Sequence, residues 1–243
     1  MIFHNCDTFA YSHQFSRYTI YRQRYSSPLL RAFLTNPDIT LSQPETKVLK
    51  NGNTSTVWLT SVGDYKLVVK RYNIKGTLHA AKRALRRSRA AISWKNAHRL
   101  EYYGIGTGPP VALIEERFGP FRKRAYFISE WVEGEDCIHF FAVNRANPHK
   151  EAKAIQTITD LLAKFAELKI SHGDMKGTNI ILTANGFAVI DLDSLLEHRT
   201  HFGFMRRFRR DVRRFMENWQ GQPRIYNLFQ KALYDRGLSQ KHL

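Results

Sequence analysis

Two short apolar runs separated by turn residues form the clearest pattern in the chain. Ile180–Thr183 and Phe187–Ile190 are strand-like, and the pair Asn185-Gly186 lies between them. An Asn-Gly pair between apolar runs is a strong short-range signal for a β-hairpin. We therefore predict a hairpin over residues 180–190, with Asn185-Gly186 as its turn.

Apolar periodicity elsewhere predicts strands in the first half of the chain and helices mainly in the second. Short β-branched and aromatic runs predict strands near residues 46–50, 55–61, 66–71, 111–117 and 122–129. Apolar residues repeating every three or four positions predict helices near residues 77–103, 136–145, 150–168, 204–219 and 223–237.

Polar side chains with the chemistry of phosphoryl transfer flank the predicted hairpin. Asp174 can accept a proton from an attacking hydroxyl, and Lys176 can reach a transferring phosphate. Asn179 and Asp191 offer the hard oxygen ligands that Mg²⁺ prefers. A polar turn with Asp174 and Asn179 as caps is the simpler alternative, but caps do not require His172 and all four of these groups at these offsets. The spacing favours a catalytic loop.

An early strand carries a candidate phosphate-binding lysine. Lys70 lies at the end of the apolar run that begins at Lys66, where kinase-like folds hold the α- and β-phosphates of ATP. The preceding loop, residues 50–55, stands where a phosphate-covering hairpin loop belongs, although it has only Gly52 in place of three glycines. An edge-strand lysine in water is the alternative for Lys70 alone, and the downstream Asp174 favours the ATP role.

The chain resembles the lipopolysaccharide core kinases, the Kdo and heptose kinase family, which are small bacterial members of the protein-kinase-like fold. The resemblance covers roughly residues 45 to 220. It rests on five segments: Val68–Tyr72, Gly104–Pro110, Ile128–Gly134, His172–Asn179 and Ile190–Ser194.

The resemblance implies an α+β, two-lobed fold with a small antiparallel-sheet N-lobe and a compact helical C-lobe. The expected parts are an N-terminal extension at 1–44, an N-lobe at 45–129, a hinge at 130–134 and a C-lobe at 135–243. It also implies ATP and Mg²⁺ as cofactors, with the backbone of Glu130 and Val132 meeting adenine. The implied acceptor is a sugar of the lipopolysaccharide inner core or linked to lipid A. Asp211 is expected to anchor the backbone of the catalytic loop.

Two departures from regulated protein kinases favour a small acceptor. Gly173 replaces the arginine that reads an activation-loop phosphate, so a switch of that type is not expected. Only 52 residues follow Asp191, without an Ala-Pro-Glu segment, which is too little for the large lobe that docks peptide substrates. We expect a small-molecule or glycolipid acceptor.

The glutamate that usually pairs with the phosphate-binding lysine is missing. Its position falls on Ser93, just before Trp94, and serine cannot neutralise Lys70. Either a nearby carboxylate substitutes, or phosphate and Asp191 alone hold Lys70. The candidate carboxylates are Glu101, Glu115 and Glu116.

A net charge of +17 fits either a solvated basic face without a partner or an anionic partner, and the clustering of the charge favours the partner. The excess gathers in two predicted helices, around Lys82–Arg89 and along Phe204–Trp219, where arginines surround an apolar face. An anionic inner-membrane surface or a phosphorylated lipid A-type acceptor fits such patches. Nucleic-acid binding on a kinase-shaped scaffold remains open as a weaker alternative, because no readout motif is present and the aromatic residues of the second helix follow a helix-core spacing.

Other interpretations remain open. A RIO-like atypical kinase shares a compact kinase fold, and a pseudokinase-like nucleotide-binding module would explain Ser93 and the glycine-poor loop at Gly52. Two distant cysteines, Cys6 and Cys137, and an amino terminus without an apolar signal region predict a cytoplasmic protein, peripheral at the inner membrane.

Overall fold

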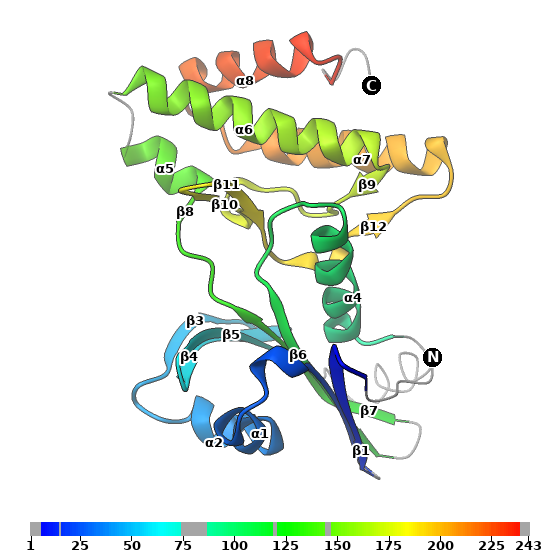
Figure 1. Ribbon diagram of the computed structural model, residues 1–243. Helices are drawn as coiled ribbons and strands as arrows, with labels where there is room; N and C mark the ends of the chain where they lie inside the picture. The colour runs from blue at the N-terminus through cyan, green and yellow to red at the C-terminus, as the bar shows by residue number, and fades with distance from the viewer. Residues whose placement is uncertain (1–5, 15, 74–86, 119–120, 144–146, 239–243) are drawn as a thin grey trace. The chain divides into compact units, whose positions relative to one another are not determined.

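Among the described residues, an antiparallel sheet lies before residue 131 and the longest helices lie after it, so the chain has the predicted α+β class (Figure 1). The computed structural model describes residues 6–14, 16–73, 87–118, 121–143 and 147–238. The chain divides into an N-terminal unit, residues 1–99 and 108–131, and a C-terminal unit, residues 100–107 and 132–243. The second division falls after Trp131, inside the expected hinge at 130–134.

In the described part of the N-terminal unit, seven antiparallel strands form one sheet in the order β1-β2-β6-β7-β5-β4-β3. The strands are β1 (Phe9–Gln14), β2 (Arg17–Arg22), β3 (Lys47–Asn51), β4 (Ser55–Val62), β5 (Tyr65–Tyr72), β6 (Pro110–Phe118) and β7 (Phe121–Glu130). The last five agree with the predicted strands. The first two lie in the segment 1–44, expected only as an extension, and β2 pairs with β6 inside the sheet.

Helices cover the two faces of this sheet with separate cores. On one face, Leu30 of α1 (Pro28–Thr35) and Leu41 of α2 (Pro37–Leu41) pack in one cluster with Val69. On the other face, Trp94 of α4 (Arg89–Tyr102) packs in a cluster with Tyr72. Because side chains alternate along a strand, Lys70 shares the α4 face with Tyr72. A short 3₁₀ turn, η1 (Gln23–Tyr25), precedes α1.

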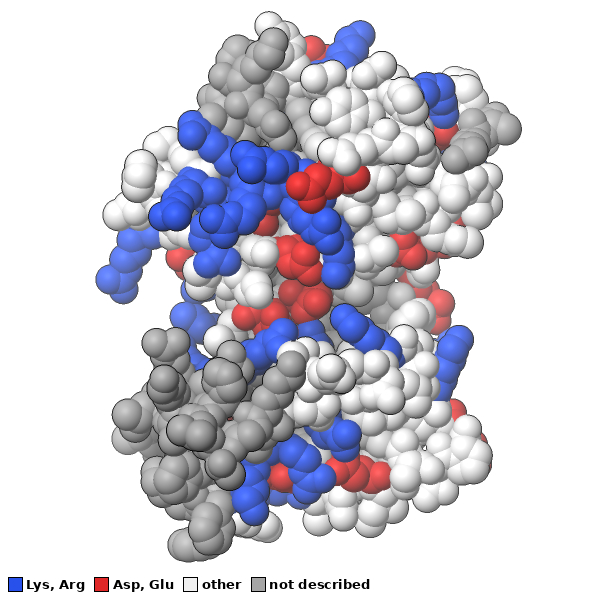
Figure 2. Space-filling view, turned by 180° about the vertical axis from the view of Figure 1, so that it is seen from behind, with Lys and Arg blue, Asp and Glu red and all other residues white. Residues whose placement is uncertain are grey.

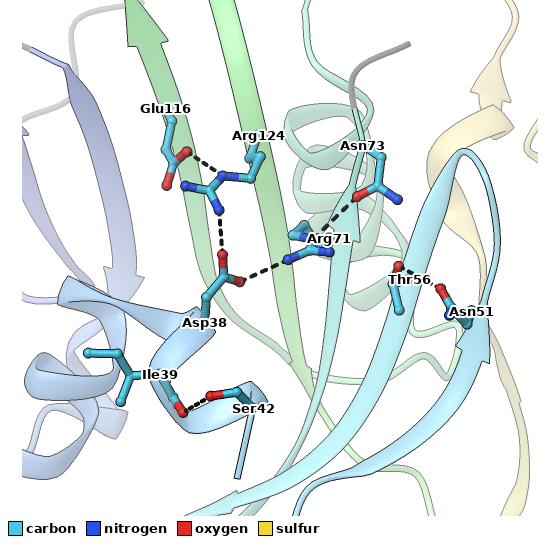
Figure 3. Close-up of polar contacts among 9 residues, drawn as sticks. All are labelled: Asp38, Ile39, Ser42, Asn51, Thr56, Arg71, Asn73, Glu116 and Arg124. Carbon is cyan, nitrogen blue, oxygen red and sulfur yellow. Dashed lines mark hydrogen bonds and ion pairs between the residues drawn. The ribbon is translucent and has the colours of Figure 1, made fainter.

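An ion-pair network holds α2 against the sheet (Figure 3). Asp38 at the start of α2 accepts hydrogen bonds from Arg71 of β5 at 3.2 Å and from Arg124 of β7 at 2.5 Å. Arg124 also donates to Glu116 of β6 at 2.9 Å. Arg71 therefore points to the α2 face of the sheet. Because neighbouring side chains of a strand point to opposite faces, Lys70 points to the α4 face.

The helix predicted over residues 77–103 has a different start. In the described chain α4 begins at Arg89, and the Ser88 hydroxyl accepts a hydrogen bond from the Ala91 backbone N–H at 3.0 Å. A serine in that position ends the helix on its N-terminal side, because it caps an otherwise unpaired amide. The predicted continuation through residues 87 and 88 is therefore wrong. Residues 77–86, with most of the first basic cluster, lie outside the described residues.

The predicted hairpin forms the centre of a small sheet in the C-terminal unit. β10 (Ile180–Thr183) pairs with β11 (Gly186–Val189) and with β8 (Glu135–Asp136). Thr183 faces Gly186, so the two loop residues are Ala184 and Asn185, one position before the predicted turn pair. Gly186, with a φ of 140°, enters the strand in a conformation that glycine adopts without penalty.

Helices supply the rest of the C-terminal unit. They are α5 (Cys137–Val143), α6 (Pro148–Glu167), α7 (His201–Glu217) and α8 (Pro223–Asp235). Phe141, Phe215, Trp219 and Phe229 form a buried aromatic cluster among α5, α7 and α8, with Trp219 and Phe229 stacked at 5.2 Å. Within the described chain, every helix is too short or too polar to cross a bilayer.

Candidate active site

The candidate catalytic loop begins after β9 (Ile170–Ser171), which pairs with β12 (Leu196–Glu197). The side chain of Asp211 in α7 binds the backbone of the first turn of this loop. The Oδ2 atom accepts a hydrogen bond from the His172 backbone N–H at 2.6 Å, and Oδ1 accepts one from the Gly173 N–H at 2.9 Å. Asp211 is buried, and this burial raises the pKa of its carboxyl, while the two backbone donors oppose the rise. Asp211 thus has the anchoring position that the sequence predicts.

His172 connects the loop to the strand before Asp191. Its Nε2 lies 2.9 Å from the Ile190 carbonyl oxygen, and its Nδ1 accepts a hydrogen bond from the Asp174 backbone N–H at 3.3 Å. An acceptor at Nδ1 leaves the ring proton on Nε2, which donates to Ile190. The imidazole is fully buried. It therefore orders the backbone of both carboxylate residues and has no exposed nitrogen for chemistry.

Position 173 requires glycine for two physical reasons. Its φ of 86° is a conformation that side-chain-bearing residues rarely adopt. A Cβ atom there would also lie 2.7 Å from the Arg207 guanidinium and 2.9 Å from Ser194. The arginine of regulated protein kinases cannot occupy this position, which explains the departure seen in the sequence.

Asp174 projects between two cations. The Lys176 Nζ atom lies 3.1 Å from Asp174 Oδ2, and the Arg214 Nε atom lies 3.6 Å from Oδ1. The carboxylate is about 39% exposed, so a hydroxyl can reach it. Lys176, which the sequence assigns to the transferring phosphate, is close enough to Asp174 to serve the same reaction centre.

Asn179 and Asp191 fit a divalent cation. Asn179 is in the 3₁₀ turn η2 (Gly177–Asn179), and its Nδ2 donates to the Asp174 carbonyl oxygen at 2.9 Å. This bond turns the amide so that Oδ1 remains as the free oxygen. Asp191 precedes the turn η3 (Leu192–Ser194) in a left-handed conformation, φ 63°, and the adjacent Ile190 N–H donates to the Asn179 carbonyl.

Few protein ligands are available around this pair. Among the described residues, no group of three or more His, Cys, Asp and Glu side chains could hold a metal ion. Magnesium commonly uses one or two carboxylates together with substrate phosphates. The set Asn179 and Asp191 therefore suits Mg²⁺ that arrives with a nucleotide.

In the N-terminal unit, an aromatic ring accompanies the candidate phosphate-binding lysine. Lys70 Nζ lies 5.1 Å from the centre of the Tyr72 ring, and the Arg89 guanidinium lies 5.0 Å from it. The Tyr72 hydroxyl is 2.9 Å from the Oγ of buried Ser93. Ser93, at the helix position expected to carry glutamate, therefore faces the sheet. It contacts Tyr72, and Tyr72 in turn contacts Lys70.

The proposed substitute glutamates have other partners. Glu115 pairs with Arg117 at 3.0 Å, and Glu116 pairs with Arg124 at 2.9 Å. Both therefore already balance an arginine. The third candidate, Glu101, belongs to the C-terminal unit.

The backbone groups expected to meet nucleotide are partly used within the N-terminal unit. The Glu130 N–H donates to the Pro109 carbonyl at 2.9 Å, so only its carbonyl can serve adenine. The Gly52 N–H donates to the Ser55 carbonyl at 3.1 Å, so Gly52 shapes the β3–β4 turn and has no free amide for phosphate. Val132 directly follows the division between the units.

The structure groups the predicted site residues by unit. Asp174, Lys176 and Asn179 lie together in the C-terminal unit, with Asp191 tied to them through Ile190. Lys70, Gly52 and Glu130 belong to the N-terminal unit. Sequence reasoning did not identify Arg214 as a site residue. A usable signal was its spacing, since Arg214 lies three residues after the predicted anchor Asp211 and so on a neighbouring face of α7.

Comparisons with known proteins identify the family and the fold of the chain. The profile of the lipopolysaccharide kinase (Kdo/WaaP) family matches residues 40–217. No curated protein sequence matches the chain. Among solved structures, the chain is similar to "WaaP in complex with acyl carrier protein", with a TM-score of 0.60 and 17% identity over 88% of each chain. At this identity the likeness shows the fold alone.

Proposed function

This chain belongs to the lipopolysaccharide kinase (Kdo/WaaP) family, and we propose that it transfers the γ-phosphate of MgATP to a sugar hydroxyl of the lipopolysaccharide inner core, on Kdo or heptose. The observation that carries this proposal is the position of Asp174. It is exposed, flanked by Lys176 and Arg214, and located on a loop whose backbone Asp211 and His172 hold in place.

Asp174 is the proposed catalytic base. The attacking hydroxyl gives its proton to the Asp174 carboxylate as its oxygen bonds to the γ-phosphorus, and the bond from phosphorus to the β–γ bridging oxygen breaks to leave ADP. Lys176 offsets the negative charge on the transferring group. Arg214 orients the carboxylate from the opposite side.

The remaining residues bind the nucleotide and its metal. Asn179 and Asp191 would hold Mg²⁺, which would neutralise phosphate charge. Lys70 holds the α- and β-phosphates. For adenine, we propose the carbonyl of Glu130 and the backbone of Val132, with Gly52 shaping the loop over the phosphates.

Transfer of label from γ-labelled MgATP to deep-rough lipopolysaccharide or Kdo-lipid A tests the proposal. We expect label in the glycolipid with the unaltered protein. Asp174→Ala should lower the rate about 10²–10⁴-fold, as loss of a general base does. Because Asp174 is exposed, the variant should unfold at nearly the same temperature. Near-normal activity of this folded variant would remove Asp174 as the base.

A second candidate function is a pseudokinase-like nucleotide-binding module, which Ser93 favours because it leaves Lys70 without the usual glutamate. Nucleotide binding without transfer to any core sugar would support this alternative. If thermal unfolding is unchanged by MgATP, both nucleotide-dependent functions are excluded. A Lys70→Met variant is the matched control for nucleotide binding.

A further inference from the structure

One face of α7 carries a row of cations that the active site does not use. Phe202, Arg206, Arg210 and Arg213 follow one another at spacings of four, four and three, which places them along one side of the helix. With Arg209, His201 and Met205 they line a groove of about 900 Å³. Figure 2 shows Lys and Arg side chains gathered on this part of the C-terminal unit. We call this surface the arginine groove.

The arginines of the groove differ from their neighbours on the same helix. Arg207 donates to the Ser194 carbonyl at 3.1 Å, and Arg214 pairs with Asp174 and Glu217. Within the described parts of the chain, the four groove arginines make no ion pair, and no carboxylate lines the groove. Like charges held together in this way repel, and an anionic partner would relieve that repulsion.

An exposed aromatic residue stands at the start of the same row. Phe202 is 82% exposed, whereas Phe204, Phe208 and Phe215 of the same helix are buried. A helix with arginines and a phenylalanine on its outer face has the composition of interfacial helices, which bury the aromatic residue at the boundary between headgroups and acyl chains.

We propose that the arginine groove docks on a bilayer surface rich in anionic phospholipids, with Phe202 inserted among the headgroups. Charge complementarity favours this partner, since each basic residue near an anionic bilayer strengthens binding about fivefold. Nucleic acid fits less well, because the other aromatic residues of α7 are buried and cannot stack on bases. A folded protein partner fits less well, because only Phe202 and Met205 offer an apolar centre for an interface.

The arginine groove lies on the same helix as Arg214, which contacts the proposed catalytic base Asp174. Arg214 follows Arg210 by one helical turn and contacts Asp174. Docking through α7 would therefore bring the catalytic loop toward the lipid surface, where a lipid-linked acceptor is found. This consequence rests on the proposed function, but the docking itself does not, because it needs neither nucleotide nor acceptor.

Co-sedimentation with vesicles tests the proposal directly. The full chain should bind vesicles of phosphatidylcholine and phosphatidylglycerol, and not vesicles of phosphatidylcholine alone. Arg206→Gln with Arg210→Gln should weaken binding roughly 30-fold, from about fivefold per charge. Arg206→Lys with Arg210→Lys keeps the charge and should retain most of the vesicle binding. Phe202→Ala should weaken vesicle binding by itself. Binding should also fall steeply as salt is added.

A matched control removes the same charge elsewhere in the unit. Lys150 and Lys153 are exposed on α6, and changing both to Gln should have little effect on vesicle binding. Equal losses in the two double variants would overturn the proposal in favour of a general charge effect. Retention on heparin without vesicle binding would overturn it in favour of a soluble anionic partner. The altered side chains are exposed, so circular dichroism should show all variants folded.

Discussion

At the scale of single residues, Tyr72 contacts both Lys70 and Ser93. Its ring faces Lys70, and its hydroxyl contacts Ser93, the position of the missing glutamate. A cation near the face of an aromatic ring is attracted by the ring's quadrupole. Tyr72 therefore offers a physical reason why a lysine at position 70 can be held beside a serine.

Replacing the Tyr72 ring should weaken nucleotide binding, because the ring helps to position Lys70, the proposed phosphate-binding residue. We expect Tyr72→Leu to raise the KM for ATP roughly fivefold, the equivalent of about 1 kcal/mol for a cation–π contact. Tyr72→Phe keeps the ring and should change KM little. The comparison of KM and kcat for the two variants measures this effect, and equal KM values in both would rule out a role for the ring.

At the scale of secondary-structure elements, one contact between β2 and α4 makes stability depend on pH. Arg22 Nη2 donates to His98 Nδ1 at 2.9 Å, and burial together with the nearby arginines lowers the pKa of His98 to about 4. The folded pKa is below the unfolded value of 6.5, so the folded state resists protonation. The stability that this contact contributes is present above pH 6.5 and is lost as the pH falls toward 4.

Thermal or urea unfolding between pH 7 and pH 5 measures this contribution. His98 should account for a loss of about 2 kcal/mol over that interval. His98→Asn keeps an acceptor near the Nδ1 position but cannot titrate, so its stability should fall less with pH. If the two pH profiles are parallel, His98 remains accessible to protons and does not produce the effect.

A second element-scale contact joins α7 to the catalytic loop. Asp211→Ala would leave the buried backbone N–H of His172 without its acceptor, whereas the N–H of Gly173 belongs to an exposed residue and can bind water. An unsatisfied buried amide costs about 1–3 kcal/mol, so we expect a destabilisation of about 1–3 kcal/mol by urea unfolding. Asp211→Asn retains one acceptor oxygen and should cost less. A smaller loss in the alanine variant than in the asparagine variant would contradict this assignment.

At the scale of the whole molecule, the charge of +17 should itself limit stability. Repulsion among like charges opposes the compact state, and salt screens it. We expect sodium chloride, raised from about 0.02 M to 0.2 M, to stabilise the protein by about 1 kcal/mol and to raise Tm by about 2–4 °C. Differential scanning calorimetry checks this, and a Tm that falls with salt would show that ion pairs such as Asp38–Arg124 outweigh the repulsion.

Local patterns along the chain were sufficient to predict most elements and the proximity of the candidate site residues on one loop. Alternating and helical periodicities located β3 to β7, the hairpin and the C-terminal helices, because those patterns reflect which face of an element is buried. His172, Asp174, Lys176 and Asn179 are adjacent in sequence, so a short loop necessarily keeps them close. The start of α4 was mispredicted because the Ser88 cap outweighs continued helical composition.

Other features depend on contacts between distant segments, which no local pattern records. Strands β1 and β2 became part of the sheet through pairing of β2 with β6, far along the chain. The six arginines of α7 look alike in sequence, yet packing directs Arg214 to Asp174 and Arg207 to Ser194, and leaves the others in an open groove. Sequence determines which charges and faces exist. Tertiary packing decides which partners they meet, because a side chain's environment is set by whichever segments fold against it.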